Sequence, residues 1–575
     1  MTTASSLDNA RTKTLRHYRS STILRIIFWF IAVSLGLIQA WVTRFAMNPD
    51  GVSYLDIGDG FWRGDLRLLL NGYWSPLYGF LLGLAMKILK PTAYWEFPVV
   101  HLVNFLIYLL ALLSFDLFLR EFIKSRTRNL DSGLPEHLWL TIGYLLFISS
   151  SLLMINLEIV SPDMCVAACI YLAAALLLRI RANPQQKSNF IFLGVVLGFG
   201  YLSKTVMFPL AFVILAASFI MARGWRRANR TSLLALIVFL AIAAPLILAL
   251  SWSKRRPTFG ESGKLNYVWE VNQIPKYVHW HGEPATSGAP KHPTRKIFDQ
   301  PAIYEFATPS PGSYPPWFDP SYWYDGAKIT FDLRRQLDVL SHGSLVCLSG
   351  FVDLAGNLFA LLFLLLAMNR RRWSLRQMAS SSWFLLLLAL VALLMYSMVF
   401  VSTRYIASFE VLLWFSIFSG LQTGRPRSRR WFDYLAVCLA IVFVFSVQTQ
   451  PPFSETVHNF LQNKSEPAPD QLKIADALIK MGIQPGDKVA SLGGALFPHW
   501  YRLARVQIVA EAPGGQNAVR QFRQATPADR EQILRLFAQT GARALIAEMV
   551  PRGQDLDGWQ RIADTDAWVY FLHDR

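Results

Sequence analysis

Two short acidic segments have residue types that could move a proton. The first follows an apolar run and reads Asn48-Pro-Asp-Gly-Val-Ser-Tyr54, so Asp50 and Tyr54, four residues apart, would share one face of a helix. The second contains Glu158 and Asp163 in a connection that has no basic residue. Carboxylates at the ends of membrane spans are costly and usually serve a function. Either segment could supply a general base that takes the proton of an attacking hydroxyl.

Two isolated basic residues complement these acids. Lys204 and Arg404 are each the only Lys or Arg in an otherwise uncharged connection between apolar runs. A carboxylate that takes a proton, together with cations that stabilise a departing phosphate, would suit transfer from a phosphate-linked donor. Each residue also has a structural interpretation. An aspartate after a span can cap a helix, and a lone Lys or Arg can extend to lipid headgroups.

The composition indicates that these residues belong to a membrane protein. The chain has 575 residues, of which 53% are hydrophobic and 16% are charged, whereas about 25% are charged in an average soluble protein. Its net charge of +18 could indicate nucleic-acid binding. The basic residues, however, form short clusters between apolar runs, which is a signal of membrane topology. We therefore expect contact with the lipid bilayer and no nucleic-acid partner.

Eleven apolar runs predict membrane-spanning helices, which need about 20 residues each. Basic clusters precede the first run and follow every second one, so the positive-inside rule places the N-terminus in the cytoplasm. The two acidic segments, Lys204 and Arg404 then all fall at the outer face. The predicted spans are residues 23–43, 97–119, 138–155, 163–179, 189–203, 205–222, 231–251, 344–368, 380–400, 404–422 and 431–447.

Two regions fit this count less simply. Residues 75–89 are apolar but too short to span a bilayer. We interpret them, with residues 56–70, as helices at the outer membrane interface, where amphipathic helices and aromatic side chains are typical. Residues 189–222 must hold either two short crossings or a re-entrant hairpin. The aromatic residues that we assign to the interface are Trp62, Tyr73, Trp74 and Tyr78.

Two long segments remain outside the apolar runs. Residues 252–343 form an outer loop whose aromatic run Tyr314–Tyr324 favours ordered structure. The end of this loop, Asp332–Leu340, predicts a helix along the membrane surface. The tail, residues 448–575, alternates helix and strand signals and predicts a small α/β domain. The helices expected in the tail are 470–480, 497–504 and 526–539, and the strands are 488–492, 506–510, 543–547 and 568–572.

These signals divide the chain into three parts. A cytoplasmic segment, residues 1–22, precedes a transmembrane domain, residues 23–447, that includes the outer loops 44–96 and 252–343. A soluble outer domain, residues 448–575, follows. The predicted fold class is mainly α. It is a polytopic α-helical membrane protein of about eleven spans with a C-terminal α/β domain on the outer face.

Two further motifs carry weaker signals. Gly493-Gly494 follows a predicted strand, but the pattern G-x-G-x-x-G is missing, so a structural or acceptor-binding domain is favoured over a nucleotide site. His279 and His281 could bind zinc, yet no third ligand is in view. The histidines therefore favour a structural or sugar-contact role.

The order and topology of these motifs resemble the GT-C superfamily of polytopic membrane glycosyltransferases, which contains protein O-mannosyltransferases and aminoarabinose transferases of lipid A. The resemblance covers roughly residues 23–420. Many members have Pro-Pro-Leu where this chain has Ser75-Pro-Leu, and a doubled carboxylate where it has Pro49-Asp50. The motifs that carry the resemblance are Asp50-Gly-Val-Ser-Tyr54, Ser75-Pro-Leu-Tyr78, Ser161-Pro-Asp163, Gly198-Phe-Gly-Tyr-Leu-Ser-Lys204 and Thr403-Arg404-Tyr405.

The resemblance implies an inverting transfer of a sugar from a polyprenyl-phosphate carrier to an acceptor hydroxyl. Asp50 matches the position of the family's general base. Glu158 and Asp163 match a second acidic motif, which would orient the acceptor or bind a divalent cation. Oxygen-only ligands would suit Mg²⁺ or Mn²⁺, although some relatives need a metal and others do not.

The same resemblance assigns the donor phosphate to Lys204 and Arg404, with Tyr54 and Tyr405 in supporting positions. The expected partners are a polyprenyl-phosphate-linked sugar and an acceptor glycan, lipid or protein. The expected location is the bacterial inner membrane, with the C-terminal domain in the periplasm. The alternative is a polytopic transporter or lipid flippase of cell-envelope biogenesis. Transporters usually have broken helices, midplane charges and repeated halves, whereas the charges singled out above lie at the outer rim.

Overall fold

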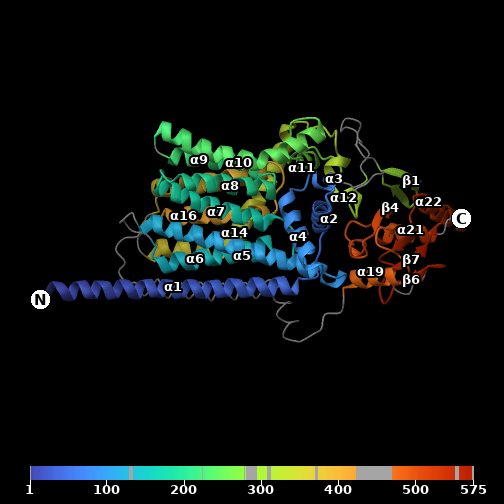
Figure 1. Cartoon of the computed structure of the whole chain (residues 1–575), viewed down its shortest axis with the longest axis horizontal. Helices are drawn as coiled ribbons and strands as arrows, with labels where there is room; N and C mark the ends of the chain where they lie inside the picture. Colours follow the sequence, from blue (N-terminus) through green and yellow to red (C-terminus); the bar gives the residue numbers. More distant parts are fainter. Residues whose placement is uncertain are drawn as a thin grey trace.

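The protein is a mainly helical, multi-pass membrane protein with a small C-terminal sheet, as the sequence predicts (Figure 1). Its structure is a computed structural model that describes residues 2–127, 134–222, 224–276, 279, 294–306, 312–368, 373–421, 469–550 and 556–572. In Figure 1 the long helices lie side by side, and the sheet with the C-terminus lies beyond one end of them.

The long helices correspond to the first ten predicted spans. They are α1 (Thr2–Val42), α5 (Ala93–Thr127), α6 (Glu136–Ser149) continued by the π-helix η1 (Ser150–Ile155), α7 (Asp163–Ala182), α8 (Lys187–Ser203), α9 (Met207–Met221), α10 (Trp225–Lys254), α14 (Leu333–Met368), α15 (Leu375–Ser397) and α16 (Thr403–Ser419). Seven helices of the described part are long and apolar enough to cross a membrane. The helices α8, α9 and α16 are shorter, with 17, 15 and 17 residues. The eleventh predicted span, residues 431–447, lies outside the described residues.

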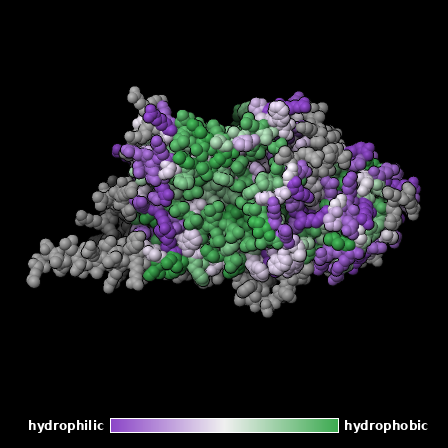
Figure 2. All heavy atoms as spheres, in the orientation of Figure 1, coloured by the Kyte–Doolittle hydropathy of each residue, from purple (hydrophilic) through white to green (hydrophobic). Residues whose placement is uncertain are grey.

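The surface of the bundle agrees with a membrane location. An apolar belt covers the helices, and hydrophilic residues lie at both ends of it (Figure 2). Only 22% of the apolar window is buried in the spans Ser21–Val42 and Asn229–Lys254. In contrast, 83% is buried in Asp163–Ala182. The spans Ser21–Val42 and Asn229–Lys254 therefore face lipid. The helix α7 lies inside the bundle, where its many alanines permit close packing against α5.

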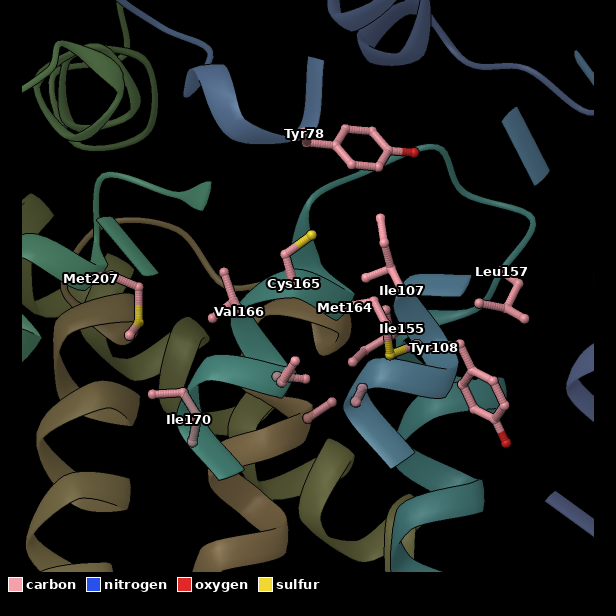
Figure 3. Packing of buried hydrophobic residues seen from close by; sticks show 14 of the residues in the cluster. Tyr78, Ile107, Tyr108, Ile155, Leu157, Met164, Cys165, Val166, Ile170 and Met207 are labelled. Carbon is pink, nitrogen blue, oxygen red and sulfur yellow. The ribbon is translucent and has the colours of Figure 1, made fainter. Parts of the chain in front are cut away.

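Tyr78 belongs to the core and not to the membrane interface that the sequence predicts for it. Its side chain is fully buried, and its hydroxyl donates to Asn104 Oδ1 at 2.5 Å. Figure 3 shows Tyr78 above Cys165 and Ile107 in the packed interior. A buried tyrosine needs a hydrogen-bond partner for its hydroxyl, and Asn104 on α5 supplies one. This contact attaches α4 (Pro76–Leu89) to the bundle.

Close packing against α4 fixes the helix that begins near Asp50. This helix, α2 (Pro49–Arg63), crosses α4 at glycines on both sides. A Cβ atom on Gly58 would lie 2.6 Å from the carbonyl oxygen of Gly79, and one on Gly83 would lie 2.6 Å from that of Gly58. Only glycine permits such an approach of two backbones. The position of α2 is therefore set by these residues.

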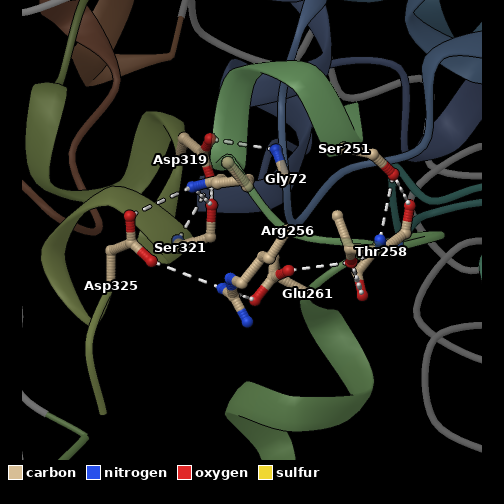
Figure 4. A network of polar contacts seen from close by, with 10 residues as sticks. Gly72, Ser251, Arg256, Thr258, Glu261, Asp319, Ser321 and Asp325 are labelled. Carbon is tan, nitrogen blue, oxygen red and sulfur yellow. Dashed lines mark hydrogen bonds and ion pairs between the residues drawn. The ribbon is translucent and has the colours of Figure 1, made fainter. Parts of the chain in front are cut away.

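A network of polar contacts joins the outer loops to each other (Figure 4). The Gly72 amide donates to Asp319 Oδ2 at 2.9 Å. Arg256 contacts Glu261 at 2.7 Å and Asp325 at 3.3 Å. These bonds connect the loop before α4 with the start of α11 (Ser262–Glu270) and the short helices α12 (Pro315–Phe318) and α13 (Pro320–Trp323). The loops thus form an ordered layer over one end of the bundle.

The C-terminal sheet contains strands from two distant parts of the sequence. Its order is β1-β2-β4-β3-β5-β7-β6. The strands β3 (Lys488–Gly493), β4 (Gln507–Pro513) and β5 (Ala544–Ala547) are parallel, and β6 (Gln560–Arg561) and β7 (Trp568–Phe571) are antiparallel to their neighbours. The strands β1 (Arg295–Asp299) and β2 (Ala302–Glu305) come from the outer loop, and β2 pairs with β4. The loop and the tail therefore share one sheet.

Most elements of the tail agree with the sequence prediction. The helices α19 (Asp470–Lys480) and α22 (Pro527–Gln539) lie where expected, and Thr526 caps α22 by accepting the Asp529 amide at 3.1 Å. The helix α20 (Trp500–Leu503) is shorter than predicted. The strands β1, β2 and β6 and the helix α21 (Gln516–Gln524) were not identified from the sequence.

One prediction about the outer loop is wrong. The segment Asp332–Leu340 does not form a separate helix on the membrane surface, because α14 runs without a break from Leu333 to Met368. The glycine at 343 does not end the helix. A Cβ atom there would lie 2.8 Å from the backbone of Ser397, so Gly343 allows α14 and α15 to approach closely.

Candidate active site

Asp50 lies in the first turn of α2, and Asn48 connects it to the second acidic segment. The Asn48 side chain accepts the Val160 amide at 2.9 Å and donates to the Val160 carbonyl at 3.4 Å. The Asp50 carboxylate accepts a hydrogen bond from Trp317 Nε1 at 3.0 Å and lies 3.6 Å from Arg404 Nη2. A helix N-terminus also favours a carboxylate at this position. Asp50 is therefore oriented from both sides.

Asp163 opens α7 and joins two of the predicted cations. Lys204 Nζ lies 2.6 Å from one carboxylate oxygen, and Arg404 Nε lies 3.5 Å from the other, which also accepts the Ser161 hydroxyl at 2.9 Å. The Asp163 side chain is only 3% exposed. The burial of a charged group is costly unless the group is paired and hydrogen-bonded. Asp163 therefore fixes the positions of Lys204 and Arg404.

Two tyrosines lie beside the charged residues. Lys204 Nζ is 3.3 Å from the centre of the Tyr405 ring, a cation–π contact. The Arg404 guanidinium donates to the Tyr405 hydroxyl at 3.4 Å. Tyr54 is buried on α2, and burial, together with the negative charge of Asp50, raises the pKa of its hydroxyl well above the usual value. Tyr54 therefore stays neutral and can donate a hydrogen bond.

A first cavity of about 700 Å³ brings six of the seven predicted site residues together. Its apolar wall includes Phe259, Ile329, Phe331 and Phe400. Ile329 and Phe331 are 53% and 73% exposed, so this wall opens to the surroundings of the protein. The predicted residues that line the cavity are Asp50, Tyr54, Asp163, Lys204, Arg404 and Tyr405.

A second cavity, of about 910 Å³, lies between the transmembrane part and the C-terminal sheet. Among its walls are Trp317 of α12, His279 of the outer loop and the glycine turns after β3 and β4. Asp50 and Arg404 line this cavity as well as the first one. The two residues therefore lie at the boundary between the two cavities.

Glu158 is the predicted site residue that lies apart from the others. It is not among the residues that line either cavity. Its amide donates to Asn156 Oδ1 at 2.8 Å, and its carboxylate accepts the Asn156 side chain at 3.5 Å. Asn156 has a φ of +65°, in the left-handed region. In this local turn, Glu158 therefore forms its hydrogen bonds with Asn156.

The carboxylate oxygens of this site are not arranged to coordinate a divalent cation. Both oxygens of Asp163 contact basic side chains, and Asp50 contacts Arg404 and Trp317. Within the described residues, no group of three or more His, Cys, Asp and Glu side chains is placed to hold a metal ion. Mg²⁺ and Mn²⁺ require several oxygen ligands that are free to coordinate. The positive charge in this arrangement comes from Lys204 and Arg404.

Several cavity residues were not identified from the sequence. Lys264 of α11 lines the first cavity, and its pKa is lowered by burial and by the nearby Arg256. Trp317 binds Asp50 across 267 residues of sequence. The aromatic run that contains Trp317 signalled an ordered loop, but its partner could not be deduced from sequence. Two of the aromatic residues predicted to be interfacial, Tyr73 and Trp74, line the first cavity.

One segment of the chain matches a model of a known protein family. Residues 140–252 match the family model described as dolichyl-phosphate-mannose-protein mannosyltransferase. This segment runs from α6 to α10 and contains Asp163 and Lys204. The resemblance to the GT-C glycosyltransferases is thereby confirmed over this segment. No curated protein sequence matches the chain significantly.

Several solved structures resemble the chain over most of its length at low sequence identity. ArnT from Cupriavidus metallidurans in the apo state is 12% identical, with 96% of this chain and 98% of that chain covered and a TM-score of 0.47. ArnT bound to undecaprenyl phosphate has 12% identity, coverages of 95% and 97%, and a TM-score of 0.46. The oligosaccharyltransferase AglB from Archaeoglobus fulgidus, with an inhibitory peptide and a dolichol-phosphate, has 11% identity, coverages of 92% and 69%, and a TM-score of 0.44.

Proposed function

We propose that this chain, which resembles the GT-C family over residues 140–252, is a membrane glycosyltransferase that moves a sugar from a polyprenyl-phosphate carrier to an acceptor hydroxyl. The observation that carries the proposal is that Asp50 and Arg404 line both cavities. A base and a phosphate-binding cation at one shared boundary suit a reaction between two molecules that enter from different sides.

The first cavity is suited to the donor. Three cations line it, Lys204, Lys264 and Arg404, against the two carboxylates of Asp50 and Asp163, which leaves one positive charge in excess. A Lys ammonium has three N–H donors and an Arg guanidinium has five. Lys204 and Arg404 therefore keep donors for a phosphate while they contact Asp163. The apolar wall would accommodate the prenyl chain, whose burial is favourable.

The chemistry then follows from the position of Asp50. Its carboxylate takes the proton of the acceptor hydroxyl as the hydroxyl oxygen forms a bond to the anomeric carbon of the sugar. The bond between that carbon and the phosphate oxygen breaks, and the polyprenyl phosphate leaves with the bonding electrons. Lys204, Lys264 and Arg404 stabilise the negative charge that develops on the phosphate. Attack from the side opposite to the leaving group would invert the anomeric configuration.

Asp163 has a positioning role in this proposal. It contacts both Lys204, which directly follows α8, and Arg404 of α16, and so fixes two cations from different parts of the bundle. Tyr405 packs under Lys204 and supports the same arrangement. We further propose that transfer takes place on the outer face of a bacterial inner membrane. The basic clusters of the sequence lie at the ends of the spans that are opposite to the site, and basic connections favour the cytoplasmic side.

A transfer assay tests the proposal against its alternative. Purified protein in lipid nanodiscs is incubated with undecaprenyl-phosphate-linked sugar that carries a radiolabel, together with candidate glycan, lipid and peptide acceptors. We expect labelled acceptor and released undecaprenyl phosphate. In liposomes, movement of intact lipid-linked sugar across the bilayer without cleavage would support a flippase and contradict the transferase.

A further inference from the structure

We infer that the second cavity binds the acceptor, and that this acceptor is an uncharged carbohydrate; the inference rests on the proposed function, whose base, Asp50, lines this cavity. The volume of about 910 Å³ lies near the upper end of small-molecule sites, which range from about 300 to 1,000 Å³. Such a space can hold more than one sugar ring. The placement, the charges and the wall chemistry each support this assignment.

The cavity lies at the carboxyl ends of two parallel strands. The turn Gly493-Gly494 follows β3, and Pro513, Gly514 and Gly515 follow β4, its parallel neighbour. In open α/β sheets, ligands bind in the crevice outside the carboxyl ends of the strands. The φ angles of Gly493 and Gly514 are both +121°. Such angles favour glycine, which presents bare backbone to a ligand.

The charges around the cavity are balanced among the described residues. Asp50 faces Arg404 at 3.6 Å, and His279 contacts Glu511 at 2.7 Å. The remaining charged side chain, Lys276, lies 3.7 Å from Glu270, which is outside the cavity. Arg404 and Lys276 are matched by Asp50 and Glu511, so the described part of the wall carries no net positive charge for a phosphate. The first cavity, in contrast, has one cation in excess.

The N-terminus of α21 could favour an anion, but amides near it already form hydrogen bonds within the protein. The helix α21 begins directly after Gly515, and the N-terminus of a helix attracts negative charge. The Gly515 amide, however, donates to the Gly493 carbonyl at 2.7 Å, and the Asn517 amide donates to the Gly514 carbonyl at 3.1 Å. Two of the first amides are therefore not available to a phosphate.

The polar groups in the wall are fixed for recognition of hydroxyls. Glu511 is buried and accepts bonds from Tyr314 at 2.6 Å, from the Ala495 amide at 2.7 Å and from His279 Nε2 at 2.7 Å. In the neutral imidazole this leaves Nδ1 of His279 as an acceptor for a hydroxyl. The His279 ring also stacks on Tyr304, with 4.3 Å between ring centres. Glu511 thus acts as a positioning residue for His279.

An exposed aromatic ring completes the carbohydrate-like character of the site. Phe497 lines the cavity and is 73% exposed, although it belongs to the soluble part of the chain. Met549, which is 53% exposed, lines the same cavity, and grouped exposed apolar side chains of this kind mark ligand-binding grooves. The C–H face of a sugar ring is apolar and can pack on it, while hydroxyls at the ring edge bind polar groups. Trp317 offers a second aromatic surface in the same cavity.

Direct binding of sugars to the full-length protein tests the inference. Saturation-transfer NMR in nanodiscs would be measured with three neutral disaccharides, cellobiose, chitobiose and mannobiose, and with mannose 6-phosphate. We expect at least one neutral disaccharide to bind in the millimolar range. Phe497→Ala and His279→Ala are each expected to weaken this binding by about tenfold, which corresponds to about 1.4 kcal/mol. Ile479→Ala, a change at a 39% exposed residue of α19 outside both cavities, should leave it unchanged.

Several results would overturn the inference. These are the absence of binding by all three disaccharides, preferential binding of mannose 6-phosphate, and transfer to a peptide acceptor but to none of the disaccharides. Disaccharide binding that is insensitive to both Phe497→Ala and His279→Ala would place the ligand elsewhere and would also contradict it. Binding of undecaprenyl phosphate, measured on the same preparation, tests the proposed function separately. Failure of sugar binding with intact donor binding would therefore count against the inference alone.

Discussion

Asp50 and Arg404 approach to 3.6 Å, and both residues line the two cavities of the protein. They come from helices that begin more than 350 residues apart in the chain, since α2 starts at Pro49 and α16 starts at Thr403. Arg404 also contacts Asp163 at 3.5 Å. A single guanidinium thus connects both acidic segments with the space assigned to the donor phosphate.

Arg404→Gln is expected to weaken the binding of undecaprenyl phosphate by at least about tenfold, because hydrogen bonds to a charged group contribute roughly 1.5–3 kcal/mol. Arg404→Lys should also weaken binding, since an ammonium cannot reproduce the planar fork of a guanidinium. Native mass spectrometry or a titration in nanodiscs measures the effect. Arg535→Gln, at an exposed residue of α22, is the matched control. Equal donor affinity in all three variants would contradict phosphate binding by Arg404 and would favour contact of its side chain with lipid headgroups.

Lys264 provides an independent test of the donor cavity, because it was not identified from the sequence. Burial and the neighbouring Arg256 lower its pKa, so a bound phosphate dianion should stabilise its charged form and raise that pKa. We expect Lys264→Gln to reduce donor affinity by roughly fivefold to tenfold, or about 1–1.4 kcal/mol. The loss should be smaller in high salt, which screens the interaction. A donor affinity equal to that of the wild type at low salt would exclude Lys264 from the phosphate site.

Arg502 is expected to hold the C-terminal domain on the transmembrane part. It is buried and contacts Asp56 at 2.7 Å, Asp59 at 2.7 Å and Glu96 at 2.8 Å. Removal of one partner from a buried ion pair costs about 3–5 kcal/mol, because the other charge is left uncompensated. Arg502→Gln should therefore lower the thermal midpoint and expose the domain to limited proteolysis.

Arg505→Gln is the matched control for that change. Arg505 contacts Glu96 at 2.6 Å, but its side chain is 40% exposed. Ion pairs of exposed side chains contribute only about 0–1 kcal/mol, so the decrease in thermal midpoint should be much smaller. Equal destabilisation by Arg502→Gln and Arg505→Gln would contradict the role of Arg502 in holding the C-terminal domain on the transmembrane part.

Glu548 predicts a pH dependence of stability. Burial raises the pKa of its carboxyl to about 7, and the carboxyl accepts a hydrogen bond from Trp500 Nε1. The folded state therefore binds a proton more tightly than the unfolded state, whose Glu pKa is about 4.3. Between these two values stability falls as pH rises, by up to about 4 kcal/mol, and it levels off above pH 7.

Glu548→Gln removes this titration while it keeps a hydrogen-bond acceptor. The variant should gain thermal stability relative to the wild type at pH 8 but not at pH 5. Differential scanning fluorimetry at both pH values measures the difference. A mutational effect that is the same at both pH values would show that Glu548 remains ionised in the folded protein.

Elements with a strong local signal could be predicted from the sequence. The apolar runs predicted the helices from α1 to α16 that cross or approach the membrane, and α19 has the predicted limits because its apolar residues have helical spacing. The strands β1 and β2 could not be predicted in this way. They have only five and four residues, and β2 is completed by pairing with β4, about 200 residues later in the chain.

The site was predictable only where charge itself was the signal. Isolated charges beside apolar runs identified Asp50, Asp163, Lys204 and Arg404, which the first cavity brings together. Partners that are ordinary in sequence were not identified. Trp317 is one of many aromatic residues in its loop, and its bond to Asp50 depends on how α12 packs against α2. Glu158 has the residue type of a site residue, but its local turn directs it to Asn156.

The most direct test of the account is the turnover of Asp50→Asn with labelled polyprenyl-phosphate sugar and acceptor. The amide preserves size and can still accept the Trp317 hydrogen bond, but it cannot take a proton. We expect turnover to fall roughly 10²-fold or more, while donor binding is retained. Asp50→Glu should also be impaired, because it displaces the base, whereas Asp332→Asn, at an exposed residue before α14, should not be. Turnover of Asp50→Asn near the wild-type rate, in a folded protein that binds the donor, would contradict the assignment of Asp50 as the base.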